Sequence, residues 1–129
     1  MSSPHPQFLK ELVTDTTGAV AAIHVSSEGL VVGTSPGLDR DDADKWAAVM
    51  AALSAVSTNG VDIVGSVTSI RYPWGHSIIE DRLGRNLTLV GAPDKSMLAV
   101  VGTEATDLGE LLDRMIRLAE QGLLALVAA

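Results

Sequence analysis

Cysteine is absent from this 129-residue chain, and that absence removes several kinds of chemistry at once. Disulfide bonds, thiolate zinc sites and cysteine nucleophiles all need the sulfhydryl group that the chain lacks. The fold must therefore rely on an ordinary hydrophobic core, and a single domain of this length buries roughly two thirds of its unfolded surface. The lack of cysteine also fits a reducing compartment.

Basic residues are scarce: the chain has 9 Lys and Arg against 16 Asp and Glu, which gives a formal charge of −7. A surface of that sign repels nucleic-acid phosphates and anionic lipids, so we expect neither as a partner. The sequence has no uninterrupted apolar run of about 18 residues, and its first residues, MSSPHPQFLKEL, lack the basic start and apolar core of a signal peptide. We therefore expect no membrane insertion and a cytoplasmic location.

Readable catalytic motifs are also missing. None of the three histidines, His5, His24 and His76, has an Asp, Glu or His at metal-ligand spacing within one element. His24 lies in an apolar strand, so we interpret it as a residue at the edge of the core. Neither G-x-S-x-G nor G-x-G-x-x-G occurs, and Lys95-Ser96 lacks the preceding glycines of a phosphate-binding loop.

Four aspartates, Asp39, Asp41, Asp42 and Asp44, form the densest acidic cluster. A calcium loop of the EF-hand type needs glycine at its sixth position and glutamate at its twelfth, and these positions hold Asp44 and Met50. Carboxylates near a helix N-terminus complement its partial positive charge, so the cluster indicates a helix start. We predict no catalytic, cofactor-binding or metal site, no cofactor and no enzymatic activity.

Apolar runs separated by turn residues predict five strands. The first two are joined by Ser26-Ser27-Glu28-Gly29, which suits a hairpin because glycine adopts a left-handed backbone freely. The last strand is apolar on both faces, which is typical of a central position, whereas the third carries charges and is typical of an edge. The expected strands cover residues 19–25, 30–34, 76–82, 86–91 and 97–103.

Helical spacing predicts three helices. The first is a short amphipathic helix that begins near Phe8, and the last begins at Asp107 and continues as one helix through Leu126. The middle helix follows the aspartates and extends to about residue 69, with Asn59-Gly60 as a weak point or break, before Tyr72-Pro73-Trp74-Gly75 stops it. Its expected stripe is Trp46, Met50, Leu53, Ser57, Gly60, Val64 and Val67.

The resulting order is α-β-β-α-β-β-β-α. It predicts an α/β (α+β) fold with a single antiparallel five-stranded sheet and helices on both faces. We expect one domain over residues 1–129, with residues 1–6 as a flexible tail.

Two apolar features suggest assembly. The middle helix carries many small residues, and the edge strand carries Ile78-Ile79. Alanines let another backbone approach closely, and an apolar edge without a partner is an aggregation hazard. The alternative is that the alanines pack on the chain's own sheet. The residues alone do not decide between an interface with another molecule and packing within the chain.

The segments FLKELV, GAVAAIHVSSEGLVVGTSPGLDRDDADKWAA, NLTLVGAPDKSMLAVVG and DLGELLDRMIRL together resemble the roadblock family of dynein light chain type. The resemblance covers roughly residues 8 to 120, and its particular form is similar to that of actinobacterial members. It implies a profilin/roadblock-like fold and a non-catalytic regulator or scaffold of a Ras-like small GTPase. A sensor-kinase-like protein is a further partner that the resemblance implies.

The resemblance also implies a homodimer, in which the edge strand pairs with its two-fold mate and the long helices pack together. The residues expected at this dimer or partner interface are Trp46, Met50, Leu53, Ser77, Ile78, Ile79, Glu80 and Asp81. Two other classes of function stay open: a small-molecule-sensing module, which a cavity lined by His24 would favour, and a structural light-chain-like adaptor. No arginine is marked as one that would be inserted into a GTPase site.

Overall fold

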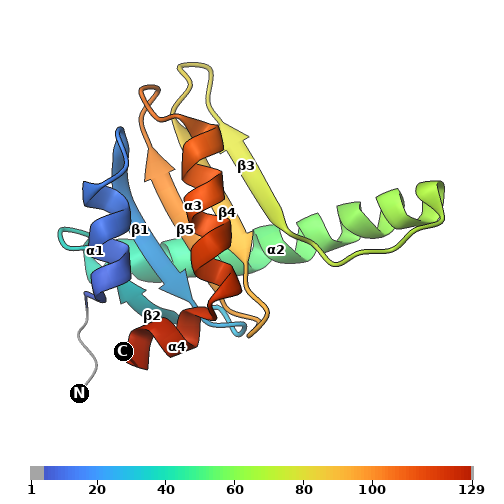
Figure 1. Ribbon diagram of the computed structural model, residues 1–129, viewed down its shortest axis with the longest axis horizontal. Helices are drawn as coiled ribbons and strands as arrows, with labels where there is room; N and C mark the ends of the chain where they lie inside the picture. Colours follow the sequence, from blue (N-terminus) through green and yellow to red (C-terminus); the bar gives the residue numbers. More distant parts are fainter. Residues whose placement is uncertain (1–4, 129) are drawn as a thin grey trace.

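The computed structural model describes residues 5–128 as one five-stranded sheet with helices on both faces, as Figure 1 shows. This arrangement confirms the predicted fold class. In chain order the elements are α1 (Gln7–Thr14), β1 (Ala19–Val25), β2 (Val31–Thr34), α2 (Arg40–Thr68), β3 (His76–Glu80), β4 (Asn86–Gly91), β5 (Met97–Gly102), α3 (Leu108–Glu120) and α4 (Leu123–Ala128).

The strand order is β2-β1-β5-β4-β3, and every pairing is antiparallel. The doubly apolar strand β5 is central and β3 is an edge strand, both as predicted. The β1–β2 hairpin turns at Gly29, whose φ of +85° is the left-handed backbone that the sequence predicted.

Each face of the sheet has its own hydrophobic cluster, because side chains alternate along a strand. The first cluster lies under α1 and α3 and includes Leu9, Leu98 and Met115. The second lies under α2 and includes Ile23 and Met50. Figure 1 shows α1 and α3 on one face and α2 crossing the other.

Helix α2 is continuous over 29 residues, so the expected weak point at Asn59-Gly60 is no break. Asp39 caps it by accepting a hydrogen bond from the Asp41 N–H at 3.2 Å, which confirms the predicted helix start. The helix ends at Thr68, close to the expected end near residue 69, and its C-cap residue Ser69 has a φ of +63°. Its second half extends past β3 (Figure 1), so Gly60, Val64 and Val67 of the expected stripe are exposed.

Strands β2 and β5 are each one residue shorter than the sequence predicted, and two further boundaries differ more. Strand β3 ends at Glu80, because Asp81 begins a turn in which its N–H donates to the Arg85 carbonyl at 2.9 Å. The terminal helix is two helices, because Gly122 has a φ of +88° and breaks the axis between α3 and α4.

Two residues of the predicted tail contact the domain. Pro6 is buried, and His5 Nδ1 lies 3.1 Å from the Thr34 carbonyl oxygen. The rest of the predicted tail, residues 1–4, lies outside the described residues.

Candidate partner interface and adjacent groove

Strand β3 leaves one backbone edge open among the described residues. The Gly91 N–H donates to the Gly75 carbonyl at 3.1 Å, and the register continues from His76 opposite Val90. Backbone groups alternate in direction along a strand, so those of His76, Ile78 and Glu80 point away from β4. These outward-pointing N–H and C=O groups can form hydrogen bonds with another strand.

The two isoleucines of β3 lie on opposite faces of the sheet. Ile78 pairs with Thr88 and shares the face of α3, whereas Ile79 pairs with Leu87 and shares the face of α2. Their exposed fractions are 38% and 46%, so each keeps apolar surface at the open edge.

Helix α2 carries an apolar flank that the chain itself leaves largely uncovered. Its members recur at alternating spacings of three and four residues, which places them along one side of a helix. They are Trp46, Val49, Leu53, Val56, Gly60, Ile63 and Val67. Trp46 and Leu53 are half-buried, whereas Val56, Ile63 and Val67 are 67%, 65% and 79% exposed. Exposed apolar surface of this extent is typical of an interaction site.

A hydrogen-bonded link fixes α2 against the start of β3. The hydroxyls of Ser57 and Ser77 lie 2.7 Å apart, and Trp74 Nε1–H donates to Ser77 Oγ at 3.0 Å. The returning loop packs closely on the helix, because a Cβ on Gly65 would lie 2.9 Å from Arg71 Cγ. The open edge and the projecting helix therefore form one rigid unit.

The residues predicted at the interface occupy five different positions. Ile78, Ile79 and Glu80 are exposed at the edge, and Trp46 and Leu53 lie on the apolar flank. Ser77 is half-buried in the link to α2, and Asp81 accepts from Arg85 Nε at 2.7 Å within its own turn. Met50 is 1% exposed and belongs to the core beneath α2.

By length and composition, α2 is apolar enough to cross a membrane. An 18-residue window of it has a mean hydropathy of 1.5, and 11% of that window is buried within the chain. The search for an uninterrupted apolar run missed this window because Ser, Thr, Asn and Asp62 interrupt it. A carboxylate is costly in a bilayer centre, and the N-terminal half of α2 packs on the sheet, so these observations favour a protein partner.

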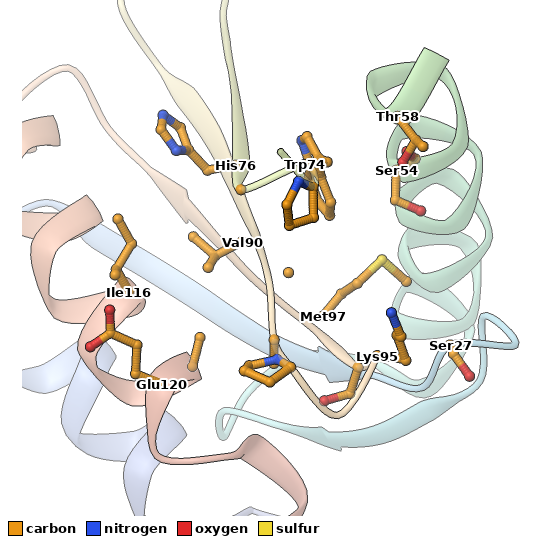
Figure 2. Close-up of a pocket in the computed structure, with 17 residues that line it drawn as sticks. Ser27, Ser54, Thr58, Trp74, His76, Val90, Lys95, Met97, Ile116 and Glu120 are labelled. Atoms are coloured by element: carbon orange, nitrogen blue, oxygen red, sulfur yellow. The ribbon is translucent and has the colours of Figure 1, made fainter. Parts of the chain in front are cut away.

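A groove of about 730 Å³ lies beside this unit, where the loop before β3 meets the β4–β5 turn. We call it the corner groove. Figure 2 shows Trp74 opposite Ser54 and Thr58 of α2, with Met97 and Lys95 below them and Glu120 on the far side, on α3. The groove lies at the corner of the sheet, whereas the cavity expected for a small-molecule-sensing module was one lined by His24.

His24 is fully buried and does not line the corner groove. Its ring packs edge-on against Phe8, with centroids 6.0 Å apart. Burial lowers the pKa of His24 to about 4, and the Asp94 carboxylate opposes this only in part. His24 is therefore neutral at pH 7 and packs as a core residue, deeper than the core edge that the sequence indicated.

Most arginines are engaged with neighbours on their own element or turn. Arg40, Arg85, Arg114 and Arg117 each form an ion pair with an aspartate or glutamate four residues away. Arg71 Nη2–H donates to Ser66 Oγ at 3.2 Å. Among residues 5–128, no group of three or more His, Cys, Asp or Glu side chains could hold a metal ion.

Sequence reasoning missed Val49, Val56 and Ile63 of the apolar flank. Their seven-residue spacing was a signal in the sequence, but the predicted stripe combined four flank residues with Met50, Ser57 and Val64 instead. It also missed the corner groove. Trp74 and Lys95 line one groove only because the loop before β3 folds back along α2.

Comparison with known proteins identifies structural relatives. A Roadblock/LC7 domain from Streptomyces avermitilis is 23% identical, with a TM-score of 0.82 over 96% of this chain and 98% of that one. An MglB structure described as having a tetrameric arrangement is 19% identical, with a TM-score of 0.75 over 95% and 86%. Profilin II from Acanthamoeba castellanii is 16% identical, with a TM-score of 0.55 over 90% and 94%. No curated protein matches the chain.

These relatives share the fold, and the profilin confirms the profilin/roadblock-like prediction. The family model for the Roadblock/LC7 domain matches residues 7–71, which include α1, the β1–β2 hairpin and all of α2. Since that match spans half of the sequence, the chain belongs to the Roadblock/LC7 domain family.

Proposed function

We propose that this protein is a homodimeric, non-catalytic platform that binds and regulates a Ras-like small GTPase in bacterial cytoplasmic signalling. The observation that carries the proposal is the joint exposure of the β3 edge and the apolar flank of α2 on one rigid unit. The resemblance to the roadblock family implies a non-catalytic regulator, which supports a binding role over an enzymatic one.

The proposed dimer pairs β3 with β3 of a second copy. Antiparallel pairing would place His76 of one copy near Glu80 of the other when Ile78 lies at the two-fold axis. The projecting half of α2 would then extend over the second copy, where its exposed valines and isoleucine could be buried. The tetrameric arrangement of the related MglB supports self-association.

The dimer would present its paired α2 helices to one GTPase. Such a platform regulates by binding one conformation of the switch loops more tightly than the other. This mechanism needs no inserted arginine, and four of the six arginines already have ion-pair partners on their own helix or turn. A sensor-kinase-like partner, implied by the resemblance, stays a prediction.

The test is capture of purified Ras-like bacterial GTPases, loaded with GDP or GTP, on the immobilised protein, with hydrolysis followed in the same samples. We expect retention that depends on the bound nucleotide. An Ile79→Lys variant that is monomeric should lose retention, and Lys10→Gln, on exposed α1 surface, should keep it. Equal retention of both nucleotide forms by wild type and monomer would contradict the proposal.

A further inference from the structure

We propose that the corner groove binds an amphipathic carboxylate, a molecule with an apolar body and one anionic group. Its volume of about 730 Å³ lies in the range of small-molecule sites. The inference goes beyond the proposed function, because it requires neither a second copy nor a GTPase.

A rigid apolar wall forms one side of the groove. The Trp74 ring lies against Gly91, where a Cβ would come within 2.9 Å of Trp74 Cζ3. The hydrogen bond from Trp74 Nε1–H to Ser77 Oγ fixes the plane of the ring. Met97 is 4% exposed and contributes apolar lining beneath it. This surface is preformed, so an apolar ligand would lose little free energy in ordering it.

The hydroxyls of the opposite side are already engaged as donors. Ser54 Oγ–H donates to the Ala51 carbonyl at 2.9 Å, and Thr58 Oγ1–H donates to the Ser54 carbonyl at 2.8 Å. Each hydroxyl has therefore used its only proton, and it can offer a ligand only its acceptor lone pairs. The Lys95 ammonium is the charged donor on this side of the groove.

The charges at the ends of the groove favour an anion at one end only. Lys95 is exposed and forms no ion pair among the described residues, in a chain whose net charge is −7. Glu120 lies at the opposite end, as Figure 2 shows, and would repel a carboxylate there. A carboxylate at Lys95 with its apolar body along Trp74 satisfies both constraints.

Lys95 also has an unusual backbone for its residue type. Its φ is +72°, a left-handed conformation that is unfavourable for a side chain with a Cβ. Asparagine tolerates this conformation better than most residues. Lys95→Asn therefore removes the charge without adding backbone strain, which makes it the preferred test variant.

The experiment follows the indole N–H resonance of Trp74 in the full chain while dodecanoate is added below its micellar concentration. The chain has two tryptophans, and Trp46→Phe assigns the second signal. We expect a saturable shift of the Trp74 signal. Binding should weaken about tenfold in Lys95→Asn, the equivalent of one charge-assisted hydrogen bond, and should be kept in Lys95→Arg.

Dodecanol, which has the same chain and no charge, tests the chemical class and should bind about tenfold more weakly than dodecanoate. No shift of Trp74 with dodecanoate, or equal shifts in wild type and Lys95→Asn, would overturn the proposal. A shift of the Trp46 signal alone would also overturn it, because that result places the ligand on the apolar flank. Sedimentation of the same samples reports the dimer separately.

Discussion

At the scale of single residues, His24 links the core to pH. It lies on the sheet face beneath α1, against Phe8, and the Asp94 carboxylate is the charge that acts on it. Its pKa in the folded protein is about 4, below the ordinary value of 6.5. The unfolded chain therefore binds more protons than the folded one as pH falls below 6.5, so stability is full at pH 7 and is lost progressively down to about pH 4.

Replacing His24 with leucine should remove this pH dependence. At pH 4.5 the wild-type chain should lose about 2–3 kcal/mol of unfolding free energy through this residue, since one pKa unit corresponds to about 1.4 kcal/mol. Urea unfolding at pH 7 and pH 4.5 measures the loss, and His76→Gln, at an exposed position, is the matched control. An acid loss of the same size in His24→Leu would show that other groups cause it.

At the scale of elements, α4 depends on Asp94, a residue of the turn between β4 and β5. The Leu124 N–H donates to Asp94 Oδ2 at 2.9 Å, and Ser96 also donates to the Asp94 carboxylate. Burial raises the Asp94 pKa, but these hydrogen bonds outweigh it and hold the pKa below its usual value. Asp94 therefore acts as a distant cap that docks α4 on the core through Leu123.

An Asp94→Ala variant should loosen α4 and leave the sheet intact. The expected loss is about 1 kcal/mol, the usual cost of removing a helix cap. Hydrogen exchange should accelerate at residues 123–127 and stay unchanged in β5. Asp107→Ala, which removes the cap of α3, is the comparison, and its effect should appear at Glu110 instead.

Strand β3 is the other element whose role can be tested alone. Ile79→Lys places two like charges close together across the proposed two-fold axis, so it should weaken the dimer at least about tenfold. Analytical ultracentrifugation over a dilution series measures the change, with Ile79→Val as the conservative control. An unchanged dissociation constant would show that this strand is not the seam.

At the scale of the whole molecule, the projecting half of α2 makes the single chain incomplete. The exposed apolar flank has no sheet beneath it past β3, so water covers it unless another surface does. A protein with this much uncovered apolar surface is expected to associate in dilute solution.

The double variant Val56→Lys/Ile63→Lys should be a soluble monomer with an intact sheet. Both side chains are about two thirds exposed, so their replacement removes little contact within the chain. Ultracentrifugation at micromolar concentration measures association, and circular dichroism reports the fold. Val20→Lys, at a 56% exposed position on β1, should remain a dimer. A monomeric wild-type protein would remove the basis for the proposed platform.

The sequence alone was sufficient for the order of elements, the hairpin at Gly29 and the central place of β5. These features depend on local chemistry: apolar alternation, turn residues and carboxylates at helix starts act over a few residues. The break at Gly122 was not read correctly, because an apolar stripe continues across it and only the backbone shows the left-handed turn.

The candidate sites were decided by tertiary structure. Met50 is buried whereas Val64, on the same side of α2, is exposed, because the sheet ends beneath the helix between them, and no local pattern specifies that position. The corner groove likewise depends on tertiary structure. Trp74 and Gly91 are distant in the sequence, and they lie side by side only because the loop before β3 folds back. Sequence determined the elements through short-range preferences, while the surfaces left for partners followed from how those elements were packed.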